Sequence, residues 1–130
     1  MLGGQANSYI YGVEYQAANL PHIIPDSMKN VGVPCSLCEA QDQHQVLMVP
    51  ATTSCPKDWL MQYRGYLMAE KSGSQSSSNY ICVNQKMEGV PGTVGDKNSG
   101  YVYPVEVKCG DLPCPPYEEG KELSCVVCTK

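Results

Sequence analysis

Eight cysteines in a chain of 130 residues constrain this fold more than any other feature of the sequence. Cysteines can bind a metal, exchange disulfides in a redox cycle or cross-link a small fold, and the choice depends on the cellular compartment. An even number of cysteines in a chain with a thin apolar core is typical of secreted, disulfide-bonded domains. We therefore predict that all eight are paired: Cys35, Cys38, Cys55, Cys82, Cys109, Cys114, Cys125 and Cys128.

The spacing of the last two cysteines restricts how they can pair. Cys125 and Cys128 lie in the stretch SCVVC, which has the pattern of a strand. Side chains three residues apart on a strand point to opposite faces. We therefore expect these two cysteines to bond different partners, while the sequence leaves the rest of the connectivity open.

Two pairs with C-x-x-C spacing, at Cys35 and Cys38 and at Cys125 and Cys128, also match the spacing of zinc ligands. The two pairs lie near opposite ends of the chain, much further apart than in zinc ribbons, and a zinc site would leave four cysteines unexplained. A thioredoxin-like redox site needs a helix that begins at the first cysteine, and no helical pattern follows either pair. A zinc module is therefore the third interpretation, and we expect neither a metal nor another cofactor.

Short apolar runs and alternating patterns predict an all-β, β-dominated fold. The chain has nine Tyr, no Phe and one Trp, and its ten Pro and twelve Gly interrupt any long helical pattern. Its length is enough for one domain with a modest core. We predict a single antiparallel, disulfide-stapled β domain over residues 1–130, with long surface loops. The expected strands are Ser8–Gln16, Gln45–Pro50, Gly65–Glu70, Asn79–Asn84, Tyr101–Cys109 and Glu122–Cys128.

Two details of this pattern make sharper predictions. The stretch Gln45–Pro50 is a continuous apolar run of the kind found in strands buried on both faces. The segments 71–79 and 91–100 are rich in Ser, Gly and polar residues, and few of their side chains can offset the entropy lost on ordering. We expect both to be mobile surface loops.

Charge and motifs exclude several classes of function. The net charge is −4 with a single arginine, Arg64, so no basic stripe is available to bind nucleic acid. No run approaches the ~20 apolar residues that span a bilayer, so no membrane contact is expected. Neither His22 nor His44 has a paired carboxylate at a motif spacing, and no nucleophile or phosphate-binding motif is present. We do not expect an enzyme.

Tyrosines on the two alternating strands offer one candidate binding surface. Tyrosine has a flat face for stacking and a polar tip, which suits contact with a sugar or a partner protein. On strands, tyrosines also serve as core residues or cross-strand pairs, and both readings stay open. The candidate platform consists of Tyr9, Tyr11, Tyr15, Tyr101 and Tyr103.

The sequence resembles the C-terminal non-collagenous domain of sponge-type short-chain collagens. The resemblance lies in the ordered fragments YGVEYQ, VPCSLC, VLMVPATTSCPKDWLMQYRGYLMAE, YICVNQ, YPVEVKCG and LPCPPYEEGKELSCVVCTK. It covers most of the chain from about Tyr9 onward, and its most specific parts are SCPKDW with GYLM, and LPCPPY with ELSCVVCTK. Similar domains occur as free-standing secreted proteins in marine invertebrates, and this chain contains no Gly-X-Y repeat.

The resemblance implies a secreted, disulfide-bonded β domain of the extracellular matrix. The leading interpretation is a structural domain that acts through protein–protein contacts and forms a homo-oligomer, with a trimer as the preferred order because collagen-linked relatives join three chains. The alternative is a secreted lectin that binds a glycan, because a compact disulfide-rich β domain with exposed Tyr and Asn is also a good sugar-binding scaffold.

Overall fold

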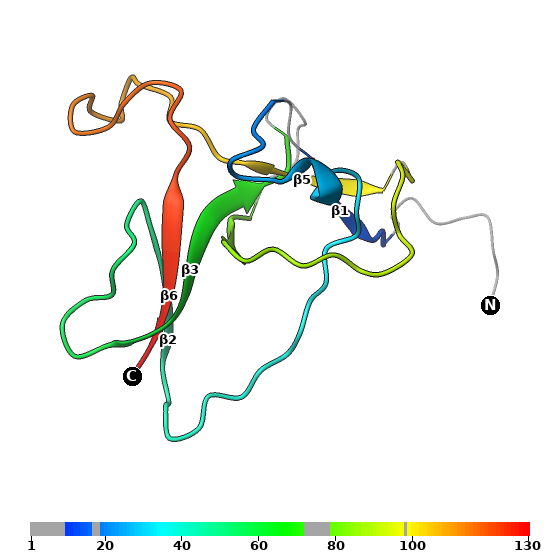
Figure 1. The fold of residues 1–130 in the computed structure, drawn as a ribbon. Helices are drawn as coiled ribbons and strands as arrows, with labels where there is room; N and C mark the ends of the chain where they lie inside the picture. The colour runs from blue at the N-terminus through cyan, green and yellow to red at the C-terminus, as the bar shows by residue number, and fades with distance from the viewer. Residues whose placement is uncertain (1–9, 17–18, 72–78, 98) are drawn as a thin grey trace, which may run out of the picture.

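The computed structural model describes residues 10–16, 19–71, 79–97 and 99–130 (Figure 1). In this part of the chain no helix has the length and apolar character needed to cross a membrane. Strands dominate, with one short 3₁₀ helix. The elements are β1 (Val13–Tyr15), η1 (Asp26–Met28), β2 (Val46–Pro50), β3 (Leu60–Ala69), β4 (Ile81–Asn84), β5 (Gly100–Pro104) and β6 (Ser124–Thr129).

The six strands form one mixed sheet with the order β1-β5-β3-β6-β2, and β4 pairs with β3 off this path. The predicted β-dominated, disulfide-bonded fold is confirmed. Its pairing is antiparallel except between β1 and β5, which run parallel. The chain between β1 and β5 is long enough to cross from one end of the sheet to the other and back, as a parallel connection requires.

The ten-residue strand β3 connects the two ends of the sheet. Its first part pairs with β6 from Leu60 to Tyr66, with a bulge between Met61 and Tyr63, and its last residues Met68 and Ala69 pair with β5. We predicted this strand only from Gly65, so the prediction left out Leu60 to Arg64. The sequence therefore missed the half of β3 that faces β6.

Two predicted strands are shorter in the structure. The strand expected over Tyr101–Cys109 ends at Pro104, because proline has no N–H to donate to a ladder. Beyond it, Glu106 forms only an isolated bridge with Glu122. The expected strand Ser8–Gln16 is reduced to β1, and residues 8 and 9 lie outside the described residues.

One end of the sheet has a covered apolar core. The irregular segment 19–31, which includes η1, packs over β1, β5 and the end of β3 (Figure 1). Burying a large apolar side chain of this kind contributes about 1.5–3 kcal/mol. The core residues are Tyr15, Ile23, Ile24, Met68, Val83 and Val102.

The loop 91–97 is fastened to this end by hydrogen bonds. The Oγ1 of Thr93 accepts a bond of 2.9 Å from the N–H of Gly32, and the N–H of Gly95 donates to the carbonyl of Asn30 at 3.1 Å. The N–H of Lys97 donates at 3.1 Å to the buried carboxylate of Glu14. These contacts argue against the mobility that we predicted for this loop, while most of the predicted loop 71–79 lies outside the described residues.

Three disulfides join six of the eight cysteines. Cys55 bonds Cys128 across 73 residues, and Cys82 bonds Cys125 across 43 residues. The prediction that Cys125 and Cys128 have different partners is confirmed. The third disulfide, Cys109–Cys114, closes a loop with a sequence separation of only 5 in the segment before β6.

Gly65 permits a close approach between β3 and β4. A Cβ at this position would lie 1.7 Å from the carbonyl oxygen of Val83, so any side chain would push β4 away. On its other side Gly65 is paired with Cys125 of β6. The missing side chain therefore allows the approach that brings the Cα atoms of Cys82 and Cys125 to 5.7 Å, within the range that a disulfide requires.

Candidate functional site

The strand β2 forms an open edge of the sheet. It is the last strand in the sheet order and, within the described chain, pairs only with β6, from Val46 with Thr129 to Pro50 with Cys125. Val46 is 72% exposed and Leu47 is also exposed. We predicted that this apolar run is buried on both faces, and in the single chain that prediction is wrong, because the side chains of Val46 and Leu47 point to opposite faces and both are exposed.

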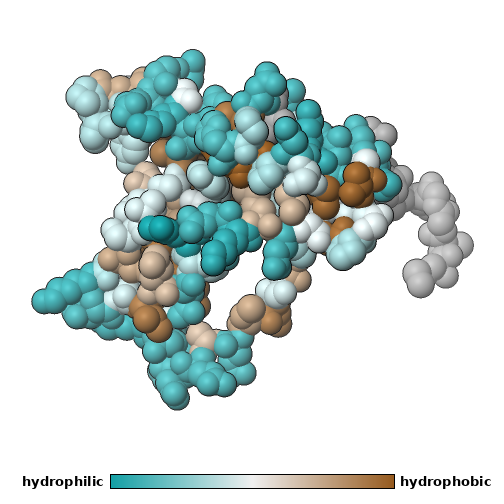
Figure 2. Space-filling view, in the orientation of Figure 1, coloured by the Kyte–Doolittle hydropathy of each residue, from teal (hydrophilic) through white to brown (hydrophobic). Residues whose placement is uncertain are grey.

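More apolar side chains are exposed across the same end of the sheet. Thr129 of β6 pairs with Val46 on one side and with Leu60 of β3 on the other, and Cys128 likewise pairs with Leu47 and Met61. Leu60 and Met61 are exposed as well. Figure 2 shows hydrophobic atoms over this part of the molecule. We call Val46, Leu47, Leu60 and Met61 the apolar edge cluster.

Sequence reasoning missed Leu60 and Met61, because we placed the start of their strand at Gly65. The apolar and aromatic residues that precede this glycine, in the stretch WLMQY, were the available signal. Met61, Gln62, Tyr63 and Arg64 alternate between apolar and polar, which is the pattern of a strand, and the structure has a bulge between Met61 and Tyr63 in the pairing with β6.

Cys35 and Cys38 are unpaired and exposed. The prediction that all eight cysteines are bridged therefore holds in the structure for six positions and not for these two. Both lie in an irregular segment with no strand, helix or turn between them. Burial raises the pKa of Tyr63 on β3, and the nearby thiols of Cys35 and Cys38 raise it further.

The predicted tyrosine platform is not assembled on one surface. Tyr15 is 2% exposed and belongs to the core, where its strand partner is Val102, so it cannot contribute to a binding face. Tyr11 is exposed, Tyr101 and Tyr103 are half-buried, and Tyr9 lies outside the described residues. Side chains alternate between the two faces of β5, so Val102 points toward the core with Tyr15, while Tyr101 and Tyr103 point to the opposite face.

Tyr101 is held by a neighbouring carboxylate. Its hydroxyl donates a hydrogen bond of 2.6 Å to Oδ1 of Asp96. This hydrogen bond is the largest of the effects that raise the pKa of Tyr101 to about 12. Tyr101 therefore anchors the loop that precedes β5, which is a structural role.

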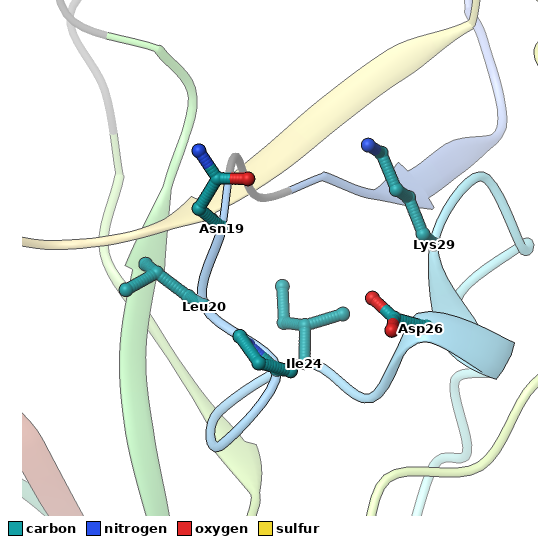
Figure 3. Close-up of a pocket in the computed structure, with 6 residues that line it drawn as sticks. Asn19, Leu20, Ile24, Asp26 and Lys29 are labelled. Carbon is teal, nitrogen blue, oxygen red and sulfur yellow. The ribbon is translucent and has the colours of Figure 1, made fainter.

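A hollow of about 370 Å³ opens beside η1 (Figure 3). Asn19 and Lys29 stand on opposite sides of it, with Ile24 between them. Its other lining residues are Leu20, Pro21 and Asp26. The hollow has a partly apolar lining and one residue of each charge sign, and it contains no histidine, cysteine or paired carboxylates that would suggest catalysis.

A second hollow, of about 540 Å³, lies between the ends of β3 and β5 and the segment that follows β5. Tyr80 and Tyr103 contribute aromatic side chains to its lining, and Lys71, Lys108 and Glu119 contribute charged groups. Lys108 forms an exposed ion pair of 3.0 Å with Glu119. Aromatic side chains next to charged and polar groups make this the better candidate for a small polar ligand.

The histidines and acids form no centre of their own. In the part of the chain that the structure describes, no group of three or more His, Cys, Asp or Glu side chains is arranged to hold a metal ion. Comparisons with protein-family models, with curated proteins and with solved structures give no match to this chain.

Proposed function

We propose that this protein is a secreted structural domain of the extracellular matrix that self-associates through the open edge of β2. One observation supports this most directly. The stretch VLMVP has the composition of a strand from the interior of a sheet, yet it lies at an edge with Val46 largely exposed. Pairing with a strand of a second copy would place it in the interior that its composition suits.

Edge strands that remain unpaired usually carry features that prevent pairing, such as an exposed lysine, a charged residue that points inward or a bulge. β2 contains no charged residue, and its proline is its last residue, Pro50. The remaining backbone groups of the edge are therefore available to another strand. Two copies of β2 in antiparallel pairing around a two-fold axis would join the two sheets into one.

Of the apolar edge cluster, Val46 and Leu47 lie on β2 itself and would flank this contact on opposite faces of the sheet. Leu60 and Met61 lie on β3, beyond β6, and would extend the apolar surface on those two faces. Methionine is enriched at protein–protein interfaces, and Met61 is 48% exposed. The three intramolecular disulfides are compatible with a secreted protein. The resemblance to collagen-linked end domains also supports a role in assembly. That resemblance favours a trimer, whereas pairing through β2 favours a dimer.

The test is sedimentation equilibrium of the wild type and two matched variants. Val46→Lys places a charge on the β2 edge, and Val94→Lys places the same charge at an equally exposed valine in a loop at the other end, since Val46 is 72% and Val94 is 73% exposed. We expect Val46→Lys to weaken self-association by at least about tenfold, which is ~1.4 kcal/mol. Val94→Lys should match the wild type, and both variants should keep the wild-type circular dichroism.

Two results would contradict the proposal. A wild type that sediments only as the 14.2 kDa species at high concentration does not self-associate. Equal weakening by both lysine variants would show that charge, and not the β2 edge, decides the association. A two-fold species supports β2 pairing, whereas a trimer that Val46→Lys leaves intact requires a different surface.

A lectin is the second candidate, and the hollow between β3 and β5 supports it. Tyr80 is exposed there and Tyr103 is half-buried, so aromatic surface is available to stack on a sugar ring. Screening the protein on a glycan array tests this function. Binding that a free monosaccharide competes away, and that Tyr80→Ala removes, would favour the lectin.

A further inference from the structure

The residues between β1 and β2 include a segment whose described backbone hydrogen bonds to the body lie at its two ends. The N–H of Val33 donates to the carbonyl of Val13 at 2.8 Å, and the N–H of His44 donates to the carbonyl of Lys130 at 2.9 Å. Within the described chain, residues 34–43 make no other backbone hydrogen bond to the body. Figure 1 shows the segment as an open trace on the β3 side of the sheet, and Figure 2 shows open space beside it.

This anchored segment presents both unpaired thiols to solvent. Cys35 and Cys38 are exposed, and Leu37 between them is fully exposed. The other six cysteines are joined to one another, so each of these thiols has no free cysteine in its own chain except the other.

Three intramolecular disulfides are typical of an oxidising compartment, and exposed thiols are oxidised there as well. In the structure Cys35 and Cys38 are not bonded to each other and lie in a segment without helix, strand or turn. Both thiols are therefore open to a partner outside the chain.

We propose that Cys35 and Cys38 form intermolecular disulfides with the same segment of a second copy of this chain. The choice of a second copy rests on the proposed function, and each copy supplies the same exposed thiols. Cys35 and Cys38 lie near Tyr63 of β3, an interior strand of the sheet, whereas the backbone edge that would pair two copies belongs to β2. Linkage through the cysteines therefore does not use the backbone groups of the β2 edge, and the two contacts together extend the assembly beyond two molecules.

The chemistry needs an oxidant, which is a small-molecule disulfide such as oxidised glutathione. The thiolate of one copy attacks this disulfide, forms a mixed disulfide and releases one small thiol. A thiolate of the second copy then attacks the sulfur of the first cysteine and releases the second small thiol. One protein disulfide forms, one small disulfide is reduced, and the protons of the two cysteines end on the two released thiols.

The experiment uses a mixture of ¹⁴N- and ¹⁵N-labelled full-length protein, folded with its three disulfides and then exposed to oxidised glutathione. Cleavage after Lys29 and after Glu39 releases residues 30–39, in which Cys35 and Cys38 are the only cysteines. We expect pairs of this peptide with one light and one heavy member, and a non-reducing gel with bands above 14.2 kDa that reductant removes. Cys35→Ser and Cys38→Ser should each give covalent species no larger than a dimer.

Three outcomes would overturn the inference. Residues 30–39 could carry an internal disulfide, both thiols could remain open to alkylation after oxidation, or zinc could co-purify with the chain and protect them from alkylation. The double variant Cys35→Ser with Cys38→Ser separates this inference from the proposed function. If it still self-associates while the wild type gives no linked peptides, only the inference fails. If Val46→Lys abolishes non-covalent association but keeps the linked peptides, only the β2 proposal fails.

Discussion

The two ends of this sheet are stabilised in different ways. At one end the segment 19–31 covers β1, β5 and the end of β3, and a buried cluster around Met68 forms the core. At the other end Val46 and Leu47 on β2 and Leu60 and Met61 on β3 are exposed, whereas β6 between them is largely buried, and the Cys55–Cys128 disulfide ties β6 to the loop before β3. The covered end is stabilised by a layer of packed side chains, and the uncovered end combines the burial of β6 with a covalent link.

This difference shows how a chain with a small core can keep an apolar surface for a partner. A disulfide stabilises mainly by restricting the unfolded chain, so it does not require a second layer of side chains over the sheet. The edge of β2 can therefore remain exposed without unfolding. We therefore predict that mutations at the covered end change stability mainly through lost packing, and that mutations at the uncovered end change it mainly through the loss of a disulfide.

The largest effect is expected from opening the disulfide at the uncovered end. Cys55→Ala with Cys128→Ala removes a bridge across 73 residues, which should cost ~4 kcal/mol in the free energy of unfolding by the chain-entropy relation. The control is Cys109→Ala with Cys114→Ala, because its sequence separation is 5. In this control the free energy of unfolding should fall by only ~2 kcal/mol.

Urea unfolding measured without reductant checks this difference. Equal losses in the two double variants would mean that loop length does not set the stabilisation. The uncovered end would then be held mainly by packing, and the contrast with the covered end would disappear.

A somewhat smaller effect is expected at the covered end from Met68→Ala. Met68 is completely buried, and truncating a buried methionine costs about 2–5 kcal/mol through lost burial and the cavity left behind. The matched control is Met61→Ala at the uncovered end, because Met61 is 48% exposed in the monomer. The free energy of unfolding of Met61→Ala should fall by no more than about 0.5 kcal/mol.

Chemical unfolding at a concentration where the protein is monomeric separates these two variants. A large loss from Met61→Ala in the monomer would show that the uncovered end has a core of its own. If the same variant loses stability only at high concentration, the exposed methionine belongs to the interface between copies.

The smallest effect is expected in the free energy of unfolding at alkaline pH, through Tyr101 at the covered end. The pKa of Tyr101 is raised to about 12 from 10.0, mainly by its hydrogen bond to Asp96. Below pH 10 both the folded and the unfolded state hold this proton, so the contribution to stability is complete. Between pH 10 and about 12 the unfolded state loses the proton first, so the free energy of unfolding should fall as the pH rises.

Stability curves of the wild type and Tyr101→Phe between pH 8 and 12 check this sign. Over the titration window given by the two pKa values, the variant should lose less stability than the wild type. A difference between the two proteins that does not change with pH would show that the Tyr101–Asp96 bond does not control the titration.

Several features of the fold follow from the sequence because they depend on neighbouring residues. The alternation around Tyr101 and Tyr103 predicted a strand, and the structure contains it as β5, although the prediction carried the strand past Pro104 to Cys109. The spacing in SCVVC placed Cys125 and Cys128 on opposite faces, so their separate partners could be predicted. These conclusions need only the geometry of a few consecutive residues.

The partners themselves were decided by the tertiary structure. Cys55 and Cys82 reach Cys128 and Cys125 because the sheet brings distant strands together, and Gly65 permits the close approach of β4. The position of VLMVP at an edge depends on which strands are its neighbours, and an apolar run has the same pattern at an edge as in the interior. The sequence shows which side chains are apolar and are therefore more stable when buried. Only the arrangement of the whole chain determines whether such a side chain is covered within one molecule or remains exposed for contact with a second molecule.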